Sequence, residues 1–377
     1  MTMLVWILTI IALASLGYWV LAWWQLERFR PILPETPAPK ECRDCPPAAL
    51  LKPCHGVEEG LLANLQSFLA QNYPSYEVLC GVQDPADPAL PLLQSLVATA
   101  GNRLRVILHQ TPLGLNPKVA NLQGILAASQ YDFLVLSDAD IRVGPGYLAT
   151  LWGELQQEGV GVVTCLYRAR VEGGGWSAVL GAQIQEQFLP SVLLAARWGP
   201  QIYCAGATIA LERTLLEKIG GFPAIADALA DDFALGAAAR ELGYRVALSA
   251  VVVETVVREE NFRAFYSHAL RWARTTRAVQ PWGHAFSFLA WPLPWLCLAS
   301  LAWGEPLGVL LVLILRLVYH ERIVRKLRSP IPLWAAFLGD CMGLILWGHA
   351  RITGKVHWRG RNFVVHAGGQ MDNGVKP

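Results

Sequence analysis

The residues best suited to chemistry are two carboxylates that follow a short apolar run. The run Phe133–Leu136 is rich in branched side chains and predicts a buried central strand, after which come Asp138 and Asp140. Open α/β sheets bind ligands at the carboxyl ends of their strands. Two acids spaced i, i+2 on an extended segment point the same way, and such a pair suits Mg²⁺ or Mn²⁺ completed by substrate phosphates. The alternative interpretation is a solvated Asp-Ala-Asp turn.

Other polar residues follow predicted elements of the same unit. Asp84 follows an apolar strand, and Asp231 and Asp232 open a predicted helix. Downstream, His268-Ala-Leu-Arg271-Trp272 lies on a long predicted helix that carries both aromatic residues and arginines. This helix has an alternative interpretation as an amphipathic segment lying on a membrane, with its arginines at lipid headgroups.

Alternating apolar strands and helices must position these residues. The order β-α-β-α-β implies a mostly parallel sheet with helices on both faces. We expect Gly173–Gly175 to lie in a loop where no helix starts, so these glycines are not a phosphate-binding motif. The predicted strands are 48–53, 76–82, 104–108, 133–136, 160–167, 205–211 and 245–253; the predicted helices are 58–72, 117–129, 214–219, 230–242 and 260–277.

The composition points to a membrane. The chain is 54% hydrophobic and 16% charged, which is too apolar for an ordinary soluble domain. The net charge of +2, without a basic run interleaved with aromatics, gives no indication of nucleic acid. Residues 3–24 form an uncharged apolar run followed by basic residues, which predicts a transmembrane anchor with the rest of the chain in the cytoplasm.

Three further apolar blocks follow at 285–303, 306–319 and 332–347. The basic segment 320–328 is expected to be a cytoplasmic loop. The third block is short and carries Asp340, and an acid inside a membrane is expensive. We favour a re-entrant or interfacial segment over a full span, which keeps the basic tail in the cytoplasm. The prediction is a multi-pass protein of the inner, cytoplasmic membrane.

Eight cysteines are scattered without the spacing of a disulfide framework. Cys42-Arg-Asp-Cys45 is a lone C-x-x-C that lacks a second pair of zinc ligands at the usual spacing. We therefore expect free thiols in a reducing compartment.

An ordered set of motifs resembles a membrane-anchored, family 2-type glycosyltransferase of the ceramide glucosyltransferase branch, including bacterial hopanoid-biosynthesis glycosyltransferases. The resemblance covers residues 49–275 and the tail. Its motifs are Leu51-Lys-Pro53, Gly56-Val57, Gln83–Ala89, Pro117–Leu122, Asp138–Val143, Ile219–Phe222, Asp231–Gly236, Arg271-Trp272 and Trp358–Arg361.

The resemblance implies a nucleotide-sugar-binding domain of the glycosyltransferase A type and gives its residues roles. Asp84 matches an acid that holds the base and ribose, and Lys118 and Asn121 match residues of the same nucleotide pocket. Asp138 and Asp140 match the metal pair that grips the donor's diphosphate.

Asp232 matches the catalytic base, in preference to the neighbouring Asp231. Arg271 matches a residue that contacts the diphosphate, and Trp272 matches one that forms an apolar wall for the acceptor or sugar. His268 replaces the first residue of that motif. The tail residues Trp358, Arg359 and Arg361 imply a contact with headgroups or acceptor.

The resulting hypothesis is an inverting hexosyltransferase that moves glucose or N-acetylglucosamine from a UDP-sugar to a lipid hydroxyl, with a hopanoid polyol favoured over ceramide. The alternatives are a processive polysaccharide synthase and a non-enzymatic membrane scaffold. The sequence identifies no protein partner. The expected organisation is an anchor at 1–26, a linker at 27–48, the glycosyltransferase domain at 49–258, an interfacial helix at 259–280, membrane segments at 281–350 and a basic tail at 351–377.

Overall fold

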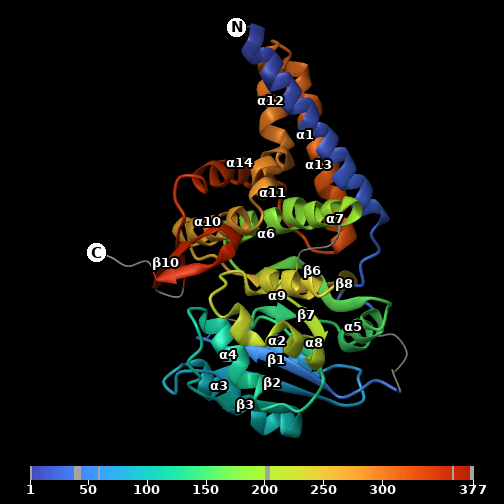
Figure 1. Cartoon of the computed structure of the whole chain (residues 1–377). Helices are drawn as coiled ribbons and strands as arrows, with labels where there is room; N and C mark the ends of the chain where they lie inside the picture. Colours follow the sequence, from blue (N-terminus) through green and yellow to red (C-terminus); the bar gives the residue numbers. More distant parts are fainter. Residues whose placement is uncertain (1, 38–43, 58–59, 200–203, 359–360, 374–377) are drawn as a thin grey trace. The chain divides into compact units, whose positions relative to one another are not determined.

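The predicted strand Phe133–Leu136 lies inside an eight-stranded sheet (Figure 1). The structure, a computed structural model, describes residues 2–37, 44–57, 60–199, 204–358 and 361–373. The chain divides into two units: a sheet unit of residues 31–167 and 200–256, and a helical unit of residues 1–30, 168–199 and 257–377.

The sheet has the strand order β3-β2-β1-β4-β7-β6-β8-β5. Strands β1, β2, β3 and β4 are parallel, whereas β7 is antiparallel to both β4 and β6. The expected mostly parallel sheet is therefore a mixed sheet. Its strands are β1 Ala48–Pro53, β2 Tyr76–Val82, β3 Leu104–Leu108, β4 Phe133–Leu136, β5 Ile141–Arg142, β6 Val160–Val171, β7 Ile209–Glu212 and β8 Arg245–Val257.

Helices cover both faces of this sheet, as the strand and helix order predicted. Alternate residues of each strand enter two separate cores, because successive side chains of a strand point to opposite faces. One core packs α2, α3 and α5 on the strands and the other packs α4, α8 and α9. The helices of this unit are α2 Leu61–Leu69, α3 Ala89–Ala100, α4 Pro117–Leu126, α5 Tyr147–Leu155, α8 Arg213–Ile219 and α9 Asp231–Glu241, with short 3-10 turns at Gly101–Arg103 and Phe222–Ile225.

The predicted helix 58–72 is α2, although residues 58 and 59 lie outside the described residues. The carboxyl ends of β1, β2 and β4 meet at one edge of the sheet because these strands are parallel neighbours. Asp84 follows β2 and Asp138 follows β4, so the sheet brings these two predicted site residues to one edge.

The helical unit contains long helices and a small antiparallel sheet, β11-β10-β9. Helices α1, α12 and α13 run side by side (Figure 1). Its elements are α1 Thr2–Arg28, α6 Gly175–Gln183, a π-helix Ile184–Phe188, α7 Leu189–Trp198, α10 Phe262–Val279, α11 Pro281–Phe286, α12 Pro292–Ala302, α13 Pro306–Leu327, α14 Leu333–His349, β9 Lys355–Trp358, β10 Arg361–Val365 and β11 Met371–Asn373, with 3-10 turns at Ser287–Ala290 and Ala367–Gly369.

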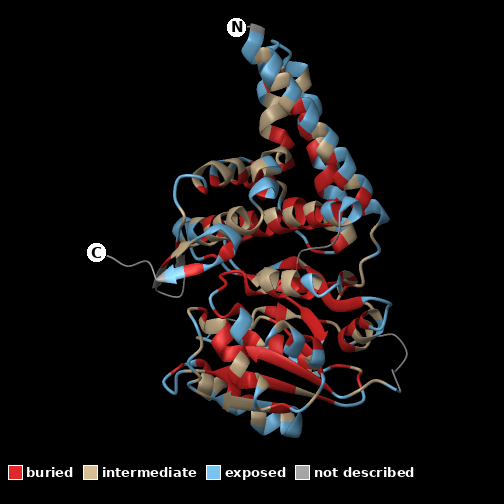
Figure 2. Ribbon diagram, viewed as in Figure 1, coloured by how far each residue is buried: buried red, intermediate tan, exposed pale blue. Residues whose placement is uncertain are grey.

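Many residues of α1, α12 and α13 are exposed (Figure 2), and many of these exposed residues are large and apolar. Within the described residues, only the helix over Met3–Arg28 is long and apolar enough to cross a membrane by itself. The pair Pro281–Ala290 and Pro292–Ala302 passes the same test when the two are joined, with a bend of 55° between them. The helix Leu333–His349 is apolar but shorter.

Three expectations were wrong, two for this unit and one for a cysteine of the sheet unit. Residues 320–327 are not a loop but the last part of helix α13, which continues beyond the apolar block. The helix ends at Leu327, and Arg328 after it has a left-handed conformation. A helix does start at Gly175, although no Lys-Ser/Thr pair follows it. Cys45 is disulfide-bonded rather than a free thiol, while Cys42 lies outside the described residues.

Asp340 is not an unpaired acid in an apolar helix. Arg316 of α13 donates from Nε to its Oδ2 at 2.7 Å, and Gln187 donates to its Oδ1 at 2.7 Å. Arg316 also pairs with Glu186 of the π-helix, and His320 Nδ1 lies 2.7 Å from the same carboxylate. We call Glu186, Arg316, His320 and Asp340 the buried ionic cluster. Because these charges are paired, the energetic cost of burying Asp340 no longer argues against α14 as a membrane segment.

Candidate active site

Lys118 brings together carboxylates that are far apart in sequence. Its Nζ lies 2.8 Å from Asp138 Oδ1 and 3.0 Å from Asp231 Oδ2. Asn116 caps α4 by accepting hydrogen bonds from the backbone N–H groups of Lys118 and Val119, which fixes the turn that carries the lysine. Burial lowers the pKa of Lys118, but Asp138, Asp231 and Asp232 outweigh burial and raise it above the usual range. We call these four residues the lysine cluster.

Asp232 is held at the start of α9. Its Oδ2 accepts a hydrogen bond from the backbone N–H of Gly206 at 2.9 Å, and its Oδ1 accepts one from Phe233 at 2.8 Å. Burial, followed by the negative charge of Asp231, raises the pKa of Asp232 to about 6. A carboxylate with this pKa is ionised at neutral pH and basic enough to take a proton.

Asp138 and Asp140 lie on a turn rather than on an extended continuation of β4, which ends at Leu136. Asp138 is bound by Lys118 and leaves 37% of its side chain exposed. Asp140 accepts a hydrogen bond from the Thr255 hydroxyl at 2.8 Å on β8. Burial and the charge of Asp138 raise the pKa of Asp140, so these two carboxylates interact electrostatically.

Gly206 packs closely against the lysine cluster. A Cβ at this position would lie 2.7 Å from Asp138 Oδ2 and 3.0 Å from Lys118 Nζ. The backbone carbonyl of Gly206 also accepts from the N–H of Asp138 at 3.3 Å. Any side chain at position 206 would collide with these charged groups, so the arrangement of the cluster requires glycine here.

Lys52 is a site residue whose role the sequence analysis missed. Its side chain is fully buried beneath the turn, where it donates to Ser137 Oγ at 3.2 Å and to the backbone carbonyl of Asp138. The ammonium lies 3.8 Å from the ring centroid of Phe68, and burial lowers its pKa to about 8. The sequence feature that could have indicated this role is that Lys52 is the single charged residue in the otherwise apolar strand β1.

The predicted nucleotide-binding residues differ in their surroundings. Asp84 is exposed and accepts a hydrogen bond from the Ala86 N–H at 2.8 Å. Asn121 is buried and donates to the carbonyls of Cys54 and Gly81, while its Oδ1 pairs with His109. Asn121 thus ties β1 to β2 behind the expected pocket.

Asp87 is a further residue whose importance sequence reasoning did not identify. It is buried and accepts hydrogen bonds from the N–H groups of Gly56 and Ala89, and it pairs with His55. These contacts join the loops after β1 and β2, and thereby fix the backbone next to Asp84.

His268, Arg271 and Trp272 belong to the helical unit, on α10. His268 Nδ1 lies 2.8 Å from Glu259 Oε1, and its ring meets Trp272 edge to face with centroids 4.5 Å apart. Trp358 and Arg361 are described by backbone alone and pair across β9 and β10, whereas Arg359 lies outside the described residues.

Asp138 and Asp140 are the candidate ligands for a divalent cation. No group of three or more His, Cys, Asp or Glu side chains is arranged to hold a metal ion within the part of the chain that the structure describes. Asp138 and Asp140 supply two hard oxygen ligands, and 37% of the Asp138 side chain is exposed to solvent. This set fits Mg²⁺ or Mn²⁺ that takes its remaining ligands from a diphosphate.

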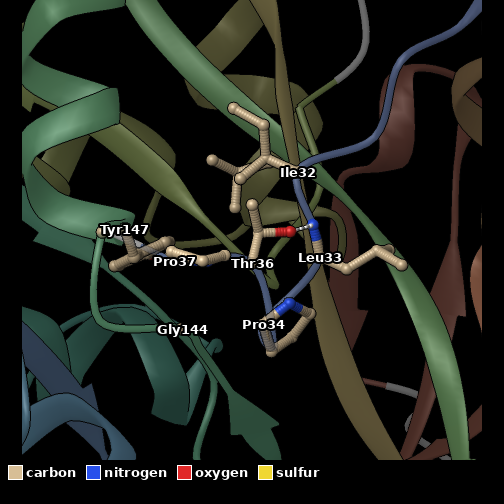
Figure 3. Close-up of a pocket in the computed structure, with 9 residues that line it drawn as sticks. Ile32, Leu33, Pro34, Thr36, Pro37, Gly144 and Tyr147 are labelled. Carbon is tan, nitrogen blue, oxygen red and sulfur yellow. Dashed lines mark hydrogen bonds between the residues drawn. The ribbon is translucent and has the colours of Figure 1, made fainter. Parts of the chain in front are cut away.

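A small pocket elsewhere in the sheet unit does not serve this role (Figure 3). It holds about 10 Å³ of water-sized space, enough for at most one water molecule. Thr36 Oγ1 accepts a hydrogen bond from the Leu33 N–H at 3.0 Å inside it. The pocket is lined by Ile32, Leu33, Pro34, Thr36, Pro37, Gly144, Gly146, Tyr147 and Val251.

Comparison with known proteins agrees with the fold and the motifs. Ceramide glucosyltransferase 1 of Caenorhabditis elegans is 24% identical over 242 residues, covering 63% of this chain and 51% of the relative. Ceramide glucosyltransferase 3 of the same organism is 20% identical over 347 residues, covering 88% of this chain and 75% of the relative. The chain thus spans about half of the first relative's length.

A solved mannosyltransferase from Pyrobaculum calidifontis, in complex with GDP-Man and Mn²⁺, shares the fold. It has a TM-score of 0.53 and 21% identity, and the match covers 89% of this chain and 99% of the other. The family described as "Glycosyl transferase family 21" matches residues 7–371, nearly the whole chain. The resemblance to ceramide glucosyltransferases is confirmed, and the chain belongs to glycosyl transferase family 21.

Proposed function

We propose that this protein transfers a hexose from a UDP-sugar to a hydroxyl group of a membrane lipid, with inversion at the anomeric carbon. The observation that carries the proposal is the lysine cluster, in which one ammonium faces Asp138, Asp231 and Asp232 next to Gly206. Membership of glycosyl transferase family 21 supports sugar transfer as the reaction.

Asp232 is the proposed base. The acceptor oxygen forms a bond to the anomeric carbon while the bond from that carbon to the diphosphate oxygen breaks, and the diphosphate leaves with the bonding electron pair. Asp232 takes the proton from the acceptor hydroxyl. Its raised pKa, and its orientation by the N–H groups of Gly206 and Phe233, suit this step.

Lys118, Asp138 and Asp140 are the proposed diphosphate-binding residues. Asp138 and Asp140 would hold Mg²⁺ or Mn²⁺, which neutralises charge on the leaving diphosphate. Lys118 exchanges its carboxylate partners for a phosphate oxygen, and Lys52 fixes the backbone of the turn that carries Asp138. The similar mannosyltransferase was solved in complex with a nucleotide sugar and Mn²⁺, which supports this assignment.

The identities of the sugar donor and of the lipid acceptor are also proposals. UDP-glucose and UDP-N-acetylglucosamine remain the two donors to compare. The named curated relatives are ceramide glucosyltransferases, which supports a lipid acceptor and weighs toward ceramide. The preference for a hopanoid polyol rests on the sequence motifs and remains a prediction.

The apolar helices support a membrane location. The helix over Met3–Arg28 suits a transmembrane anchor, and the exposed apolar surface of α12 and α13 suits contact with lipid. Placement in the inner membrane, with several spans and a cytoplasmic sheet unit, continues to rest on the distribution of basic residues.

The roles of Arg271 and Trp272 also stay predictions. Replacing Arg271 with Lys keeps a charge but removes the guanidinium fork that pairs with two phosphate oxygens. We expect a higher KM for the UDP-sugar in that variant. An unchanged KM would remove Arg271 from the donor site.

Detergent-solubilised protein offers a direct test of the proposed function. Each UDP-sugar is supplied with ceramide or a bacteriohopane polyol in matched micelles, and UDP release and glycolipid are measured together. We expect both products with one lipid and a strict need for Mg²⁺ or Mn²⁺. Transfer to a growing soluble polymer would indicate a processive synthase, and the absence of any turnover would favour a scaffold.

A further inference from the structure

Two arginines of the helical unit, Arg277 and Arg351, lie near the buried His284, and a third, Arg274, lies near Arg277. Arg277 of α10 donates to the carbonyl of Ala350 at 2.5 Å, and Arg351 donates to the carbonyl of Ala285 at 3.4 Å. Arg274 donates to the carbonyl of Lys355 at 2.6 Å, one helical turn before Arg277. These contacts join the ends of α10 and α14 to the short helix α11, which carries His284.

His284 is held in place by Trp347, but one nitrogen of its imidazole lacks a hydrogen-bond partner. Its side chain is 3% exposed, its backbone carbonyl accepts from Trp347 Nε1 at 2.8 Å, and the two rings stack with centroids 6.3 Å apart. The imidazole Nε2 is buried without a hydrogen-bond partner, and so is the Nε of Arg274. Native proteins rarely leave buried polar atoms unpaired, so two such atoms in one region indicate a missing partner.

The missing partner is negatively charged. Arg277 and Arg351 both act electrostatically on the His284 ring, and Arg277 also acts on Arg274. None of the three arginines forms an ion pair with a carboxylate within residues 2–37, 44–57, 60–199, 204–358 and 361–373. Three guanidinium groups without a counter-charge repel one another unless an anion lies among them. Guanidinium groups match the oxygens of a phosphate especially well.

The surroundings indicate where this phosphate comes from. Trp282 and Phe286, on the same short helix as His284, are 77% and 60% exposed. Tryptophan at the end of an apolar helix is typical of the membrane interface. Helix α12 follows at once and exposes Leu298 and Leu301. Basic side chains next to such a segment lie at the depth of lipid phosphates.

We propose that Arg274, Arg277, His284 and Arg351 form a binding site for the headgroup phosphate of an anionic phospholipid. The site lies wholly within the helical unit and does not rest on the proposed transferase function. The phosphate completes the hydrogen bonds of His284 and Arg274, and it balances the arginine charges. A bound lipid then holds the end of α10 and helix α11 at the membrane surface.

The test compares phosphatidylglycerol with phosphatidylcholine. The full chain is purified in detergent, delipidated and titrated with each lipid, and bound lipid is counted by native mass spectrometry. We expect the wild type to prefer phosphatidylglycerol, and the double variant Arg277→Gln/Arg351→Gln to bind it at least about tenfold more weakly. The matched control Arg322→Gln/Arg325→Gln removes two charges from exposed positions of α13 and should change the affinity less than twofold.

Each other outcome overturns the proposal. Equal weakening in the test and control variants would mean that only net charge matters. Displacement of the lipid by millimolar inorganic phosphate would assign the cluster to free phosphate, and displacement by a UDP-sugar would assign it to the donor. If the double variant does not fold, Arg277→Lys replaces it, and wild-type lipid affinity in that variant would contradict recognition by the guanidinium fork.

Discussion

The lysine cluster and the buried ionic cluster are made of the same kinds of side chain, yet their surroundings differ. In the buried ionic cluster, two basic residues face two acids, and Arg316, Glu186 and Asp340 are at most 3% exposed. In the lysine cluster, one ammonium faces three carboxylates, and Asp138 is 37% exposed. Ion pairing is therefore no sign of a functional site by itself. The unequal charge and the exposure of Asp138 indicate that a ligand completes the lysine cluster.

The largest expected effect on activity separates the base from the binding residues. We expect Asp232→Asn to lower the transfer rate about 10³- to 10⁴-fold, because the amide cannot take the acceptor's proton. Affinity for the UDP-sugar should stay within a few-fold of the wild type, since Asp232 does not contact the diphosphate in the proposed mechanism. Turnover and UDP-sugar binding are measured on the same preparation, and near-normal turnover would exclude Asp232 as the base.

The buried ionic cluster should respond through stability instead. Arg316→Met leaves Glu186 and Asp340 buried without their cation, so we expect a loss of roughly 3–5 kcal/mol in the free energy of unfolding. Thermal unfolding in detergent checks this expectation. The control Arg325→Met removes a side chain that is 78% exposed and should cost less than about 1 kcal/mol. Equal melting temperatures for both variants would erase the distinction between the two clusters.

The variant Lys118→Gln tests whether the ammonium of the lysine cluster competes with a metal ion for Asp138. Without the ammonium, Asp138 loses a competing cation, so we expect Mn²⁺ to bind the donor-free protein about tenfold more tightly, or about 1.4 kcal/mol. Affinity for UDP should fall at the same time, because a phosphate partner is lost. Calorimetry measures both affinities, with the exposed Lys218→Gln as control. Weaker Mn²⁺ binding in Lys118→Gln would show that the lysine organises the carboxylates rather than competing for them.

The smallest effect is a shift in pH dependence. The pKa of Asp232 is raised to about 6, so the base is protonated below that pH, and kcat/KM should fall on the acid side with a midpoint near 6. Asp231 is a cause of the raised pKa, and Asp231→Asn should therefore move the midpoint to lower pH. A midpoint that moves upward would contradict this electrostatic account.

The sequence predicted most of the sheet unit because its signals are local. Strands β2, β3 and β4 have the predicted bounds, since an apolar run with turn residues on both sides needs no distant information. The antiparallel insertion of β7 between β4 and β6 could not be predicted, because strand pairing depends on contacts between distant residues. The resemblance supplied the roles of the carboxylates, which strand patterns alone cannot assign.

Interactions between distant residues account for the failures. The acid at Asp340 looked unfavourable because its partner, Arg316, lies 24 positions earlier on another helix. Residues 320–327 looked like a loop because they are charged, but His320 packs inward against Glu186. Likewise, the sequence placed Lys118 among nucleotide-binding residues without showing that its ammonium joins Asp138 to Asp231.

Gly206 provides the most direct test of the claim that the lysine cluster is the donor site. Gly206 has a backbone conformation that other residues adopt, but an added Cβ would lie 2.7 Å from Asp138 Oδ2 and 3.0 Å from Lys118 Nζ, so Gly206→Ala displaces these two side chains. Calorimetry should show that Mn²⁺ and UDP together bind Gly206→Ala at least about tenfold more weakly than the wild type. Gly153→Ala, which meets open space on α5, should bind normally. Wild-type affinity in a folded Gly206→Ala protein would contradict the assignment of the donor site.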